Sequence, residues 1–361
     1  MTLEHHEYMK LALQLAEQGR YTVSPNPLVG CLIVKNKKII GKGFHQQAGQ
    51  AHAEVIAMQE AGEQAQHATA YVSLEPCCHH GRTPPCTDAL IKAGIKKVFI
   101  ACLDPNPLVA GKGIATLQAA GIEVILGIHE TEAKQLNEIF FHYIQTKRPF
   151  VIAKWAMSLD GKTITHANDE KSISCEKSKQ YSHQVRQQVD AVLIGAKTAI
   201  EDDPLLTVRH LPAEEKIIKQ PLRIVLSSRG NLPVHLKLFN TSPSAKTLIA
   251  TTEDISDSWH QAMLDKNIDV LILPKNMNAQ VDLPYLLIAL GKREITSVLV
   301  EGGMTIHQRF FQENLVNKIH LYLSPVIIGN MEKKQIASQL TCTTLGQDFY
   351  LTANYKEKPY V

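Results

Sequence analysis

The sequence has 361 residues, more than one ordinary hydrophobic core needs, so its length predicts two domains. Its composition, with 44% hydrophobic and 20% charged residues and a net charge of +3, is typical of a soluble globular protein. Basic and acidic residues are interspersed, and no apolar run approaches the roughly 20 residues of a membrane helix. We therefore expect a cytoplasmic protein without a nucleic-acid groove or a membrane segment.

Residues 1–19 lack the basic segment, apolar core and cleavage site of a signal peptide, and we expect an amphipathic helix there. The seven cysteines are an odd number, which argues against a disulfide framework. Cys31, Cys102 and Cys342 lie in apolar runs and are predicted core residues. Cys78 is a predicted packing residue.

Between residues 27 and 127, short apolar runs alternate with helical patterns, which predicts an α/β domain. Its first two runs, LVGCLIV and IIGKGF, indicate a hairpin, and the later strand, helix, strand order indicates parallel strands. A long helix is predicted over 133–147, and Pro149 then prevents helical continuation. These patterns place the predicted domains at 1–147 and 148–361.

A second alternation of strands and helices runs from FVIAKWAMS to KIHLYLSPVII and predicts another α/β domain. Residues 211–220 are a predicted exposed loop, and the pattern after Ile336 is ambiguous.

A potential metal site comes from two short segments, AHAEV and EPCCHHGRTPPC. His52, Cys77 and Cys86 supply one imidazole and two thiolates, the ligand set of a zinc ion that keeps a position open for water. A fourth ligand from Cys78, His79 or His80 would instead make a closed structural clip. The carboxylate of Glu54, two residues after His52, favours the catalytic alternative, because it can carry protons between zinc-bound water and a leaving amine.

The order HxE, PC and a later Cys is the signature of zinc nucleobase deaminases, which commonly have PCxxC. Here eight residues separate the two cysteines, and the insertion brings His79, Arg82 and Thr83 near the metal as candidate substrate ligands.

In the second half no GxGxxG follows a strand, so the usual dinucleotide fingerprint is absent. The segment VEGGMT ends a strand in paired glycines before a helix, which lets backbone donors approach a pyrophosphate closely, although a plain turn has the same pattern. The planar fork of Arg209 is suited to holding a phosphate.

The motifs SPNPLVG, GFH, HAE, EPCCHHGRTPPC and DPNPLVAGKG resemble the deaminase domain of the RibD family of bifunctional riboflavin biosynthesis proteins. The resemblance covers nearly all of residues 1–147. It implies a three-layer cytidine-deaminase-like domain in which His52, Cys77 and Cys86 hold zinc and Glu54 carries protons. It also implies that Asn26, His45 and Arg82 contact the pyrimidine or its ribose phosphate. The alternatives are a turn residue for Asn26 and a packing or surface role for His45.

The motifs SLDGK, EDDPLLTVR and VEGG are similar to the reductase domain of the same family, which implies a dihydrofolate-reductase-like fold that uses NADPH. The residues expected to line the cofactor are Ala156, Ser172, Thr198, Asp202, Ser228, Gly303, Met304, Thr305, Ile306, His307, Gln308 and Arg309. Those expected to face the substrate are Glu170, Arg186, Leu205, Arg209 and Glu301, with Lys154 as a catalytic candidate. Glu170 and Ser172 stand where the family usually has serine and tryptophan. Without the resemblance, Asp202 is typical of a helix-ending turn and Arg186 of a solvated helix face.

The sequence therefore predicts a two-domain α/β enzyme that removes an amine from a diaminopyrimidine ribose phosphate with zinc and then reduces the ribosyl group to ribityl with NADPH. We expect a homo-oligomer. Two alternatives stay open: a deaminase whose second domain binds nucleotide without reducing it, and a zinc-stabilised nucleic-acid-binding protein.

Overall fold

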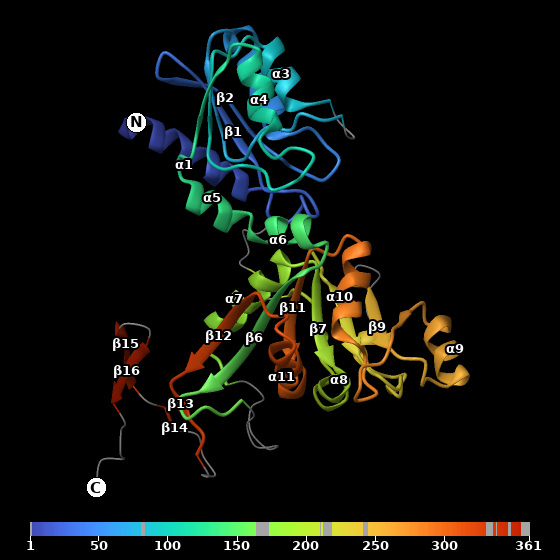
Figure 1. The fold of residues 1–361 in the computed structure, drawn as a ribbon. Coiled ribbons are helices and arrows are strands. Elements are labelled where there is room, and N and C mark those ends of the chain that lie inside the picture. Colours follow the sequence, from blue (N-terminus) through green and yellow to red (C-terminus); the bar gives the residue numbers. More distant parts are fainter. Residues whose placement is uncertain are drawn as a thin grey trace. The chain divides into compact units, whose positions relative to one another are not determined.

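The fold is taken from a computed structural model, in which two compact units are formed, one mainly by residues 1–150 and the other by most of the later chain (Figure 1). The predicted boundary between 147 and 148 stays a prediction. None of the described helices has the length and hydrophobicity needed to cross a membrane. The structure describes residues 2–80, 84–163, 173–209, 211, 219–240, 245–329, 335–336, 338–345 and 348–354.

The first unit is a five-stranded sheet with the strand order β2-β1-β3-β4-β5. The strands β1 and β2 form the predicted antiparallel hairpin, and β3, β4 and β5 pair in parallel as expected. The elements in chain order are α1 (Leu3–Glu17), β1 (Gly30–Lys35), β2 (Lys38–Phe44), α2 (Ala53–Ala61), η1 (Gly62–Ala65), β3 (Thr69–Val72), α3 (Cys86–Lys92), β4 (Lys97–Ile100), α4 (Lys112–Ala119), β5 (Glu123–Leu126), α5 (Glu130–Leu136) and α6 (Glu138–Thr146).

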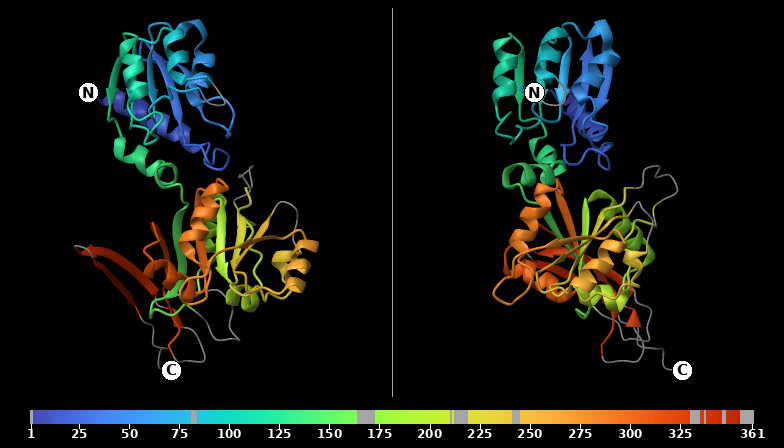
Figure 2. Two further views of the ribbon diagram at one scale, coloured as in Figure 1. Left: turned by 45° about the vertical axis from the view of Figure 1, so that its right-hand side comes forward. Right: turned by 90° about the vertical axis from the view of Figure 1, so that its right-hand side faces the viewer.

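Two hydrophobic clusters cover the two faces of this sheet and make the unit three-layered (Figure 2). Because successive strand residues point to opposite faces, Cys31 and Ile33 pack with α2, α3 and α4. Leu32 and Val34 pack on the other face, with α1 and α5. His52 and Cys86 lie at the starts of α2 and α3 in the first of these layers, and Cys77 lies in the loop between β3 and α3.

The predicted helix over 133–147 is two helices, α5 and α6, separated at Asn137. The Asn137 side chain is buried and accepts the N–H of Leu28 at 2.8 Å while donating to the Leu28 carbonyl at 2.9 Å. These two hydrogen bonds, between residues 109 positions apart, fix the segment before β1. They satisfy the buried Asn137 side chain at the point where the helix is interrupted.

The second unit contains a seven-stranded sheet with the strand order β10-β9-β8-β7-β11-β6-β12. All five residues of β7 and of β9 are buried, as is typical of parallel strands covered on both faces. The elements after α6 in chain order are β6 (Phe150–Ser158), α7 (Glu176–Gln188), β7 (Ala191–Gly195), α8 (Ala196–Asp202), β8 (Leu222–Leu226), η2 (Lys237–Phe239), β9 (Thr247–Thr251), α9 (Asp257–Asp265), β10 (Asp269–Ile272), α10 (Leu283–Lys292), β11 (Ser297–Gly302), α11 (Met304–Gln312), β12 (Lys318–Ser324), β13 (Val326–Ile327), β14 (Gln335–Ile336), β15 (Ser338–Leu345) and β16 (Asp348–Asn354). Of these, α10 belongs almost entirely to the first unit, which includes Pro284–Ser297.

The end of the chain forms an antiparallel hairpin of β15 and β16, which is not hydrogen-bonded to the seven-stranded sheet. Cys342 lies on this hairpin and is exposed, so its predicted core position is wrong, because the hairpin has no layer over it within the described chain. Cys31 and Cys102 are fully buried as predicted. Most of the predicted loop over 211–220 lies outside the described residues.

Candidate active sites

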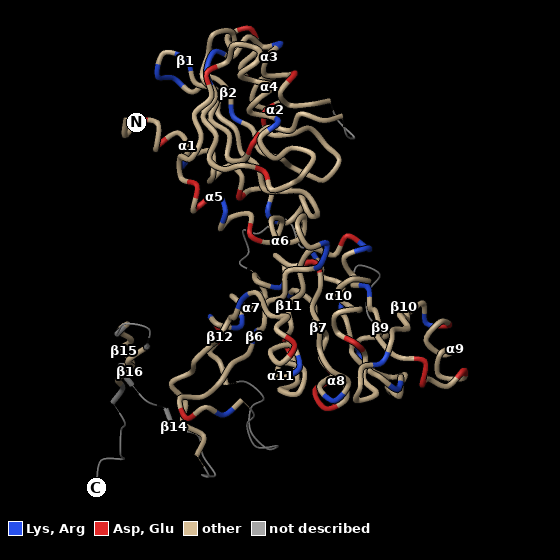
Figure 3. Tube along the Cα trace, viewed as in Figure 1, with Lys and Arg blue, Asp and Glu red and all other residues tan. Residues whose placement is uncertain are grey.

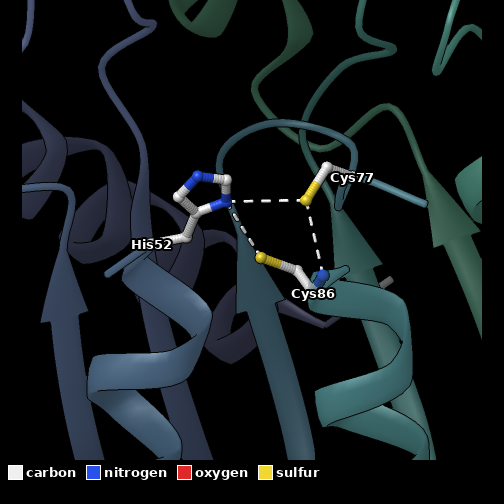
Figure 4. Close-up of side chains that lie close together, drawn as sticks. All are labelled: His52, Cys77 and Cys86. Carbon is white, nitrogen blue, oxygen red and sulfur yellow. Dashed lines mark hydrogen bonds between the residues drawn. The ribbon is translucent and has the colours of Figure 1, made fainter. Parts of the chain in front are cut away.

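The three predicted metal ligands of the first unit lie together (Figure 4). His52 precedes α2, Cys77 lies in the loop after β3, and Cys86 begins α3. The Nδ1 atom of His52 is 3.2 Å from the Cys86 sulfur and 3.5 Å from the Cys77 sulfur. A His and two Cys that present their ligand atoms to one point are suited to zinc, which takes nitrogen and sulfur ligands in a tetrahedron.

No fourth metal ligand completes this group among the described histidines, cysteines and carboxylates. The Cys78 sulfur is 3.8 Å from the carbonyl oxygen of Leu108, and His80 is exposed. Cys78 is half-buried, so it is not an enclosed packing residue. The arrangement leaves a position for water, as a catalytic zinc site requires.

Glu54 lies in the first turn of α2 and is 3% exposed. Burial and the neighbouring Cys77 raise the pKa of the Glu54 carboxyl to about 7. A carboxyl group with such a pKa can both hold and release a proton near neutral pH, which is the property of a general acid and base.

A cavity of about 450 Å³ adjoins this cluster, and His52, Glu54 and Cys77 are part of its wall. Asn26 and His45 also line it: Asn26 Nδ2 donates to His45 Nε2 at 3.0 Å, and His45 Nδ1 donates to the Ala51 carbonyl at 3.1 Å. This pairing defines a neutral His45, whose pKa is lowered by burial. The predicted substrate residue His79 lines the cavity too, whereas Arg82 and Thr83 lie outside the described residues.

Sequence reasoning missed Asp104 and Asn106, which line the same cavity. The Asn106 N–H donates to Asp104 Oδ1 at 2.8 Å, and burial raises the pKa of Asp104 to about 6. The signal was present: PNPLV occurs at 25–29 and again at 105–109, and both copies contribute an asparagine to the cavity wall.

In the second unit, three predicted residues from β6, α7 and β11 form a buried charge cluster. Glu301 accepts from Arg186 Nε at 2.5 Å and from Arg186 Nη2 at 2.8 Å, and Lys154 Nζ is 3.7 Å away. Burial alone would raise the pKa of Glu301, but Arg186 and Lys154 together lower it to about 2. The Arg186 side chain is only 14% exposed, so the solvated-helix alternative is wrong.

The turn from β11 to α11 packs closely on α8. A Cβ built on Gly302 would meet the Thr198 side chain at 2.9 Å, and Gly303 has a φ of +74°, which favours glycine. The exposed residues Met304 and Thr305 begin the helix here, so its free backbone N–H groups are available to an anion. This geometry fits the predicted pyrophosphate cradle of NADPH.

Two further cofactor candidates, Ser228 and Arg309, both bind the backbone of Val281. The N–H of Val281 donates to Ser228 Oγ at 3.1 Å, and the Val281 carbonyl accepts from Arg309 at 2.6 Å. His307 instead points inward: it is 3% exposed and Nε2 lies 3.1 Å from the Val300 carbonyl oxygen.

The remaining candidates of the second unit differ in exposure. Asp202, Arg209 and Gln308 are exposed, and Ala156, Leu205 and Ile306 are half-buried. Arg209 is positioned by its N–H, which donates to His183 Nδ1 at 3.3 Å. Glu170 and Ser172 lie outside the described residues.

Sequence comparison with family models matches both units. Residues 2–102 match the cytidine and deoxycytidylate deaminase zinc-binding region, and residues 149–353 match the RibD C-terminal domain. The riboflavin biosynthesis protein RibD of Actinobacillus pleuropneumoniae is 44% identical over 92% of this chain and 87% of its own length. That of Escherichia coli is 40% identical over 91% and 89%.

Solved structures agree over nearly the full length. The RibD of Acinetobacter baumannii has a TM-score of 0.81 at 39% identity and covers 98% of this chain and 99% of its own. The deaminase and reductase of Thermotoga maritima has a TM-score of 0.78 at 33% identity, covering 96% and 97%. The predicted fold class, a cytidine-deaminase-like unit followed by a dihydrofolate-reductase-like unit, is confirmed. The chain belongs to the RibD family of riboflavin biosynthesis proteins.

Proposed function

We propose that the first unit of this deaminase and reductase performs its hydrolytic step at the cavity beside His52, Cys77 and Cys86. The observation that carries this assignment is the convergence of these three side chains next to the buried Glu54. Zinc, when bound, supplies an activated water near neutral pH. The chain uses zinc in this unit and NADPH in the other.

The protein's own residues have separate tasks in deamination. His52 and the two cysteines hold the metal. The Glu54 carboxylate takes up a proton from the attacking water and delivers it to the leaving amine nitrogen. Asn26 and His45 bind polar groups of the pyrimidine at the cavity wall, because their hydrogen bond orients both side chains there. His79, Arg82 and Thr83 are the further candidates for the ribose phosphate.

For reduction, we propose that the buried pair of Glu301 and Arg186 orients Lys154 toward the ribosyl group, with Leu205 and Arg209 beside it. NADPH, when bound, supplies the reducing equivalents. The candidates that would hold it, Ala156, Thr198, Asp202, Ser228 and 303–309, come from segments around the β11 to α11 turn and from β6, α8 and the end of β8. Glu170 and Ser172 remain proposals from the sequence alone.

Neither alternative function is favoured by the comparisons. A nucleic-acid-binding protein would need a basic stripe, whereas Figure 3 shows Lys and Arg interspersed with Asp and Glu along the described chain. A second domain that does not reduce would be revealed by one measurement. Ammonia release and NADPH oxidation, followed separately on the same zinc-loaded sample, should both proceed. Ammonia release without NADPH oxidation would contradict the reductase assignment.

We also propose a domain boundary at 147/148, a cytoplasmic location and a homo-oligomer. All seven thiols are free, which suits a reducing compartment. Exposed apolar residues on β12 and on the final hairpin, Ile319, Leu321, Phe349 and Tyr350, support self-association. Sedimentation should give a mass above 40.1 kDa, and a monomer at micromolar concentration would contradict the oligomer.

A further inference from the structure

Glu75 is a buried carboxylate whose bonds are made to backbone N–H groups. It is 3% exposed and lies two residues before the metal ligand Cys77. Its Oε2 accepts from Asp104 N at 3.3 Å and from Gly111 N at 3.0 Å, and its Oε1 accepts from Ile114 N at 3.2 Å. Within the described chain no ion pair is formed by this side chain. A buried charge that is satisfied in this way fixes the backbone around it, because losing a bond leaves an unsatisfied buried group.

These bonds join the ligand segment to the loop that carries the cavity wall. Asp104 and Gly111 lie at the two ends of this loop, and Asn106 and Val109 line the cavity between them. The Asn106 N–H donates to Asp104 Oδ1, so a shift at Asp104 also moves Asn106. Although Glu75 itself lines the cavity, both its oxygens are engaged with backbone, so it acts through the loop.

A second close contact holds α4 against the same segment. A Cβ built on Gly113 would lie 2.2 Å from the Pro76 carbonyl oxygen and 3.1 Å from Glu75 Oε1. Only glycine permits this approach, since real Cβ contacts are far longer. Glu75 and Gly113 therefore determine together how the loop and the start of α4 lie on the metal-ligand segment.

The metal ligands have supports that do not involve Glu75. The Cys86 N–H donates to the Cys77 sulfur at 3.4 Å, and the Thr87 N–H donates to the Cys77 carbonyl at 3.2 Å. Loss of the Glu75 bonds should therefore displace the cavity wall while His52, Cys77 and Cys86 still hold zinc.

We propose that Glu75 is a positioning residue of the deaminase, which fixes the substrate-facing wall of Asp104 and Asn106 beside the metal cluster. This proposal rests on the deaminase function proposed above. In this role the glutamate of the EPCC segment supports substrate binding through Asp104 and Asn106. It neither binds the metal nor transfers a proton.

The test is Glu75→Gln. Its amide nitrogen cannot accept a hydrogen bond, so at least one backbone N–H that Glu75 now satisfies would lose its acceptor. We expect KM for deamination to rise at least about fivefold, kcat to stay within about twofold, and zinc content to stay stoichiometric. Gly113→Ala, with Glu75 intact, should reproduce the rise in KM, and it carries the test if Glu75→Gln fails to fold. Thermal unfolding of both zinc-loaded variants gives a readout besides activity.

The matched control is Glu60→Gln, the same change at an exposed carboxylate that accepts the Lys42 N–H at 2.8 Å; its KM should equal that of the wild type. An unchanged KM in Glu75→Gln and Gly113→Ala, even with lowered stability, would reduce Glu75 to a structural role. A parallel loss of kcat and zinc would place its effect on Cys77 and overturn the proposal. A wild type that releases no ammonia would instead refute the deaminase function, and the positioning role with it.

Discussion

The two active sites balance buried charge in opposite ways. In the first unit, the metal ligands His52, Cys77 and Cys86 lie beside the buried Glu54, so two thiols and a carboxylate share one site. In the second unit, one carboxylate, Glu301, is matched by Arg186 and Lys154. The first site therefore depends on a cation from outside the chain, whereas the second neutralises its own charge. Changes at one site should leave the other intact.

The largest effect is expected for Glu54→Gln. The amide keeps the size of the side chain but cannot take up or release a proton near neutral pH, so ammonia release should fall at least about a hundredfold. Zinc content, measured by atomic absorption, and NADPH oxidation with the deaminated substrate should not change. Glu60→Gln, the same substitution near the end of α2, is the control. Normal ammonia release from a zinc-replete Glu54→Gln protein would contradict the proton-transfer role.

Removal of a ligand should separate the two units. In Cys77→Ser or Cys86→Ser, zinc content should fall well below one per chain, and the first unit should unfold at a lower temperature, because metal binding contributes to its folding. NADPH oxidation should persist, since the second site has its own cations. Cys175→Ser, at an exposed cysteine, is the matched control and should keep its zinc. Stoichiometric zinc in both ligand variants would refute the ligand set.

Breaking the internal charge balance should destabilise the second unit. Glu301→Gln leaves Arg186 buried without its carboxylate, so the free energy of unfolding should fall by about 3 kcal/mol. Glu130→Gln, which removes an exposed pair with Lys134 at 2.6 Å, should cost less than about 1 kcal/mol. Urea unfolding of the zinc-loaded proteins measures both. Equal costs in the two variants would show that the buried cluster has no special role.

The pH dependence of stability checks the same cluster. The pKa of Glu301 is about 2, below its ordinary value of 4.5, so its contribution is full above pH 4.5 and is lost as the pH falls toward 2. The wild type should therefore lose more stability over this range than Glu301→Gln does. Parallel pH profiles would contradict the charged state assigned to Glu301.

The sequence could predict the first site better than the second for a physical reason. His52 and Glu54 are two residues apart at a helix start, and the two cysteines flank one loop, so short motifs place them together. Arg186 and Glu301 are 115 positions apart, and both were predicted to face the substrate without their pairing being visible. Only the sheet order, which puts β11 beside β6 and β7, brings such segments together.

The features of the fold that the sequence did not predict also depend on contacts between residues far apart in the sequence. The periodicity over 133–147 is that of one helix, but the hydrogen bonds between Asn137 and Leu28 decide where it breaks. Arg223 sits in the buried strand β8, and no sequence pattern reveals the carbonyls of Leu238 and Ala245 that accept from it at 2.9 Å and 2.5 Å. Cys342 shows that an apolar run predicts burial only where another layer covers it.

The smallest effect is expected for Arg209→Ala, which tests which guanidinium of the second unit binds the substrate phosphate. The guanidinium of Arg186 is engaged by Glu301, whereas Arg209 is exposed and its Nη1 donates to Thr207 Oγ1 at 3.0 Å. Desolvation and the positive charge of Arg186 lower the pKa of Arg209, so an anion placed there would relieve repulsion between the two. KM for reduction should rise about tenfold, the expected cost of losing one charge-assisted contact, with deamination unchanged. Equal losses in both reactions would mean that Arg209 stabilises the fold of the chain and does not bind the phosphate. The two sites would then not be independent of each other with respect to this residue.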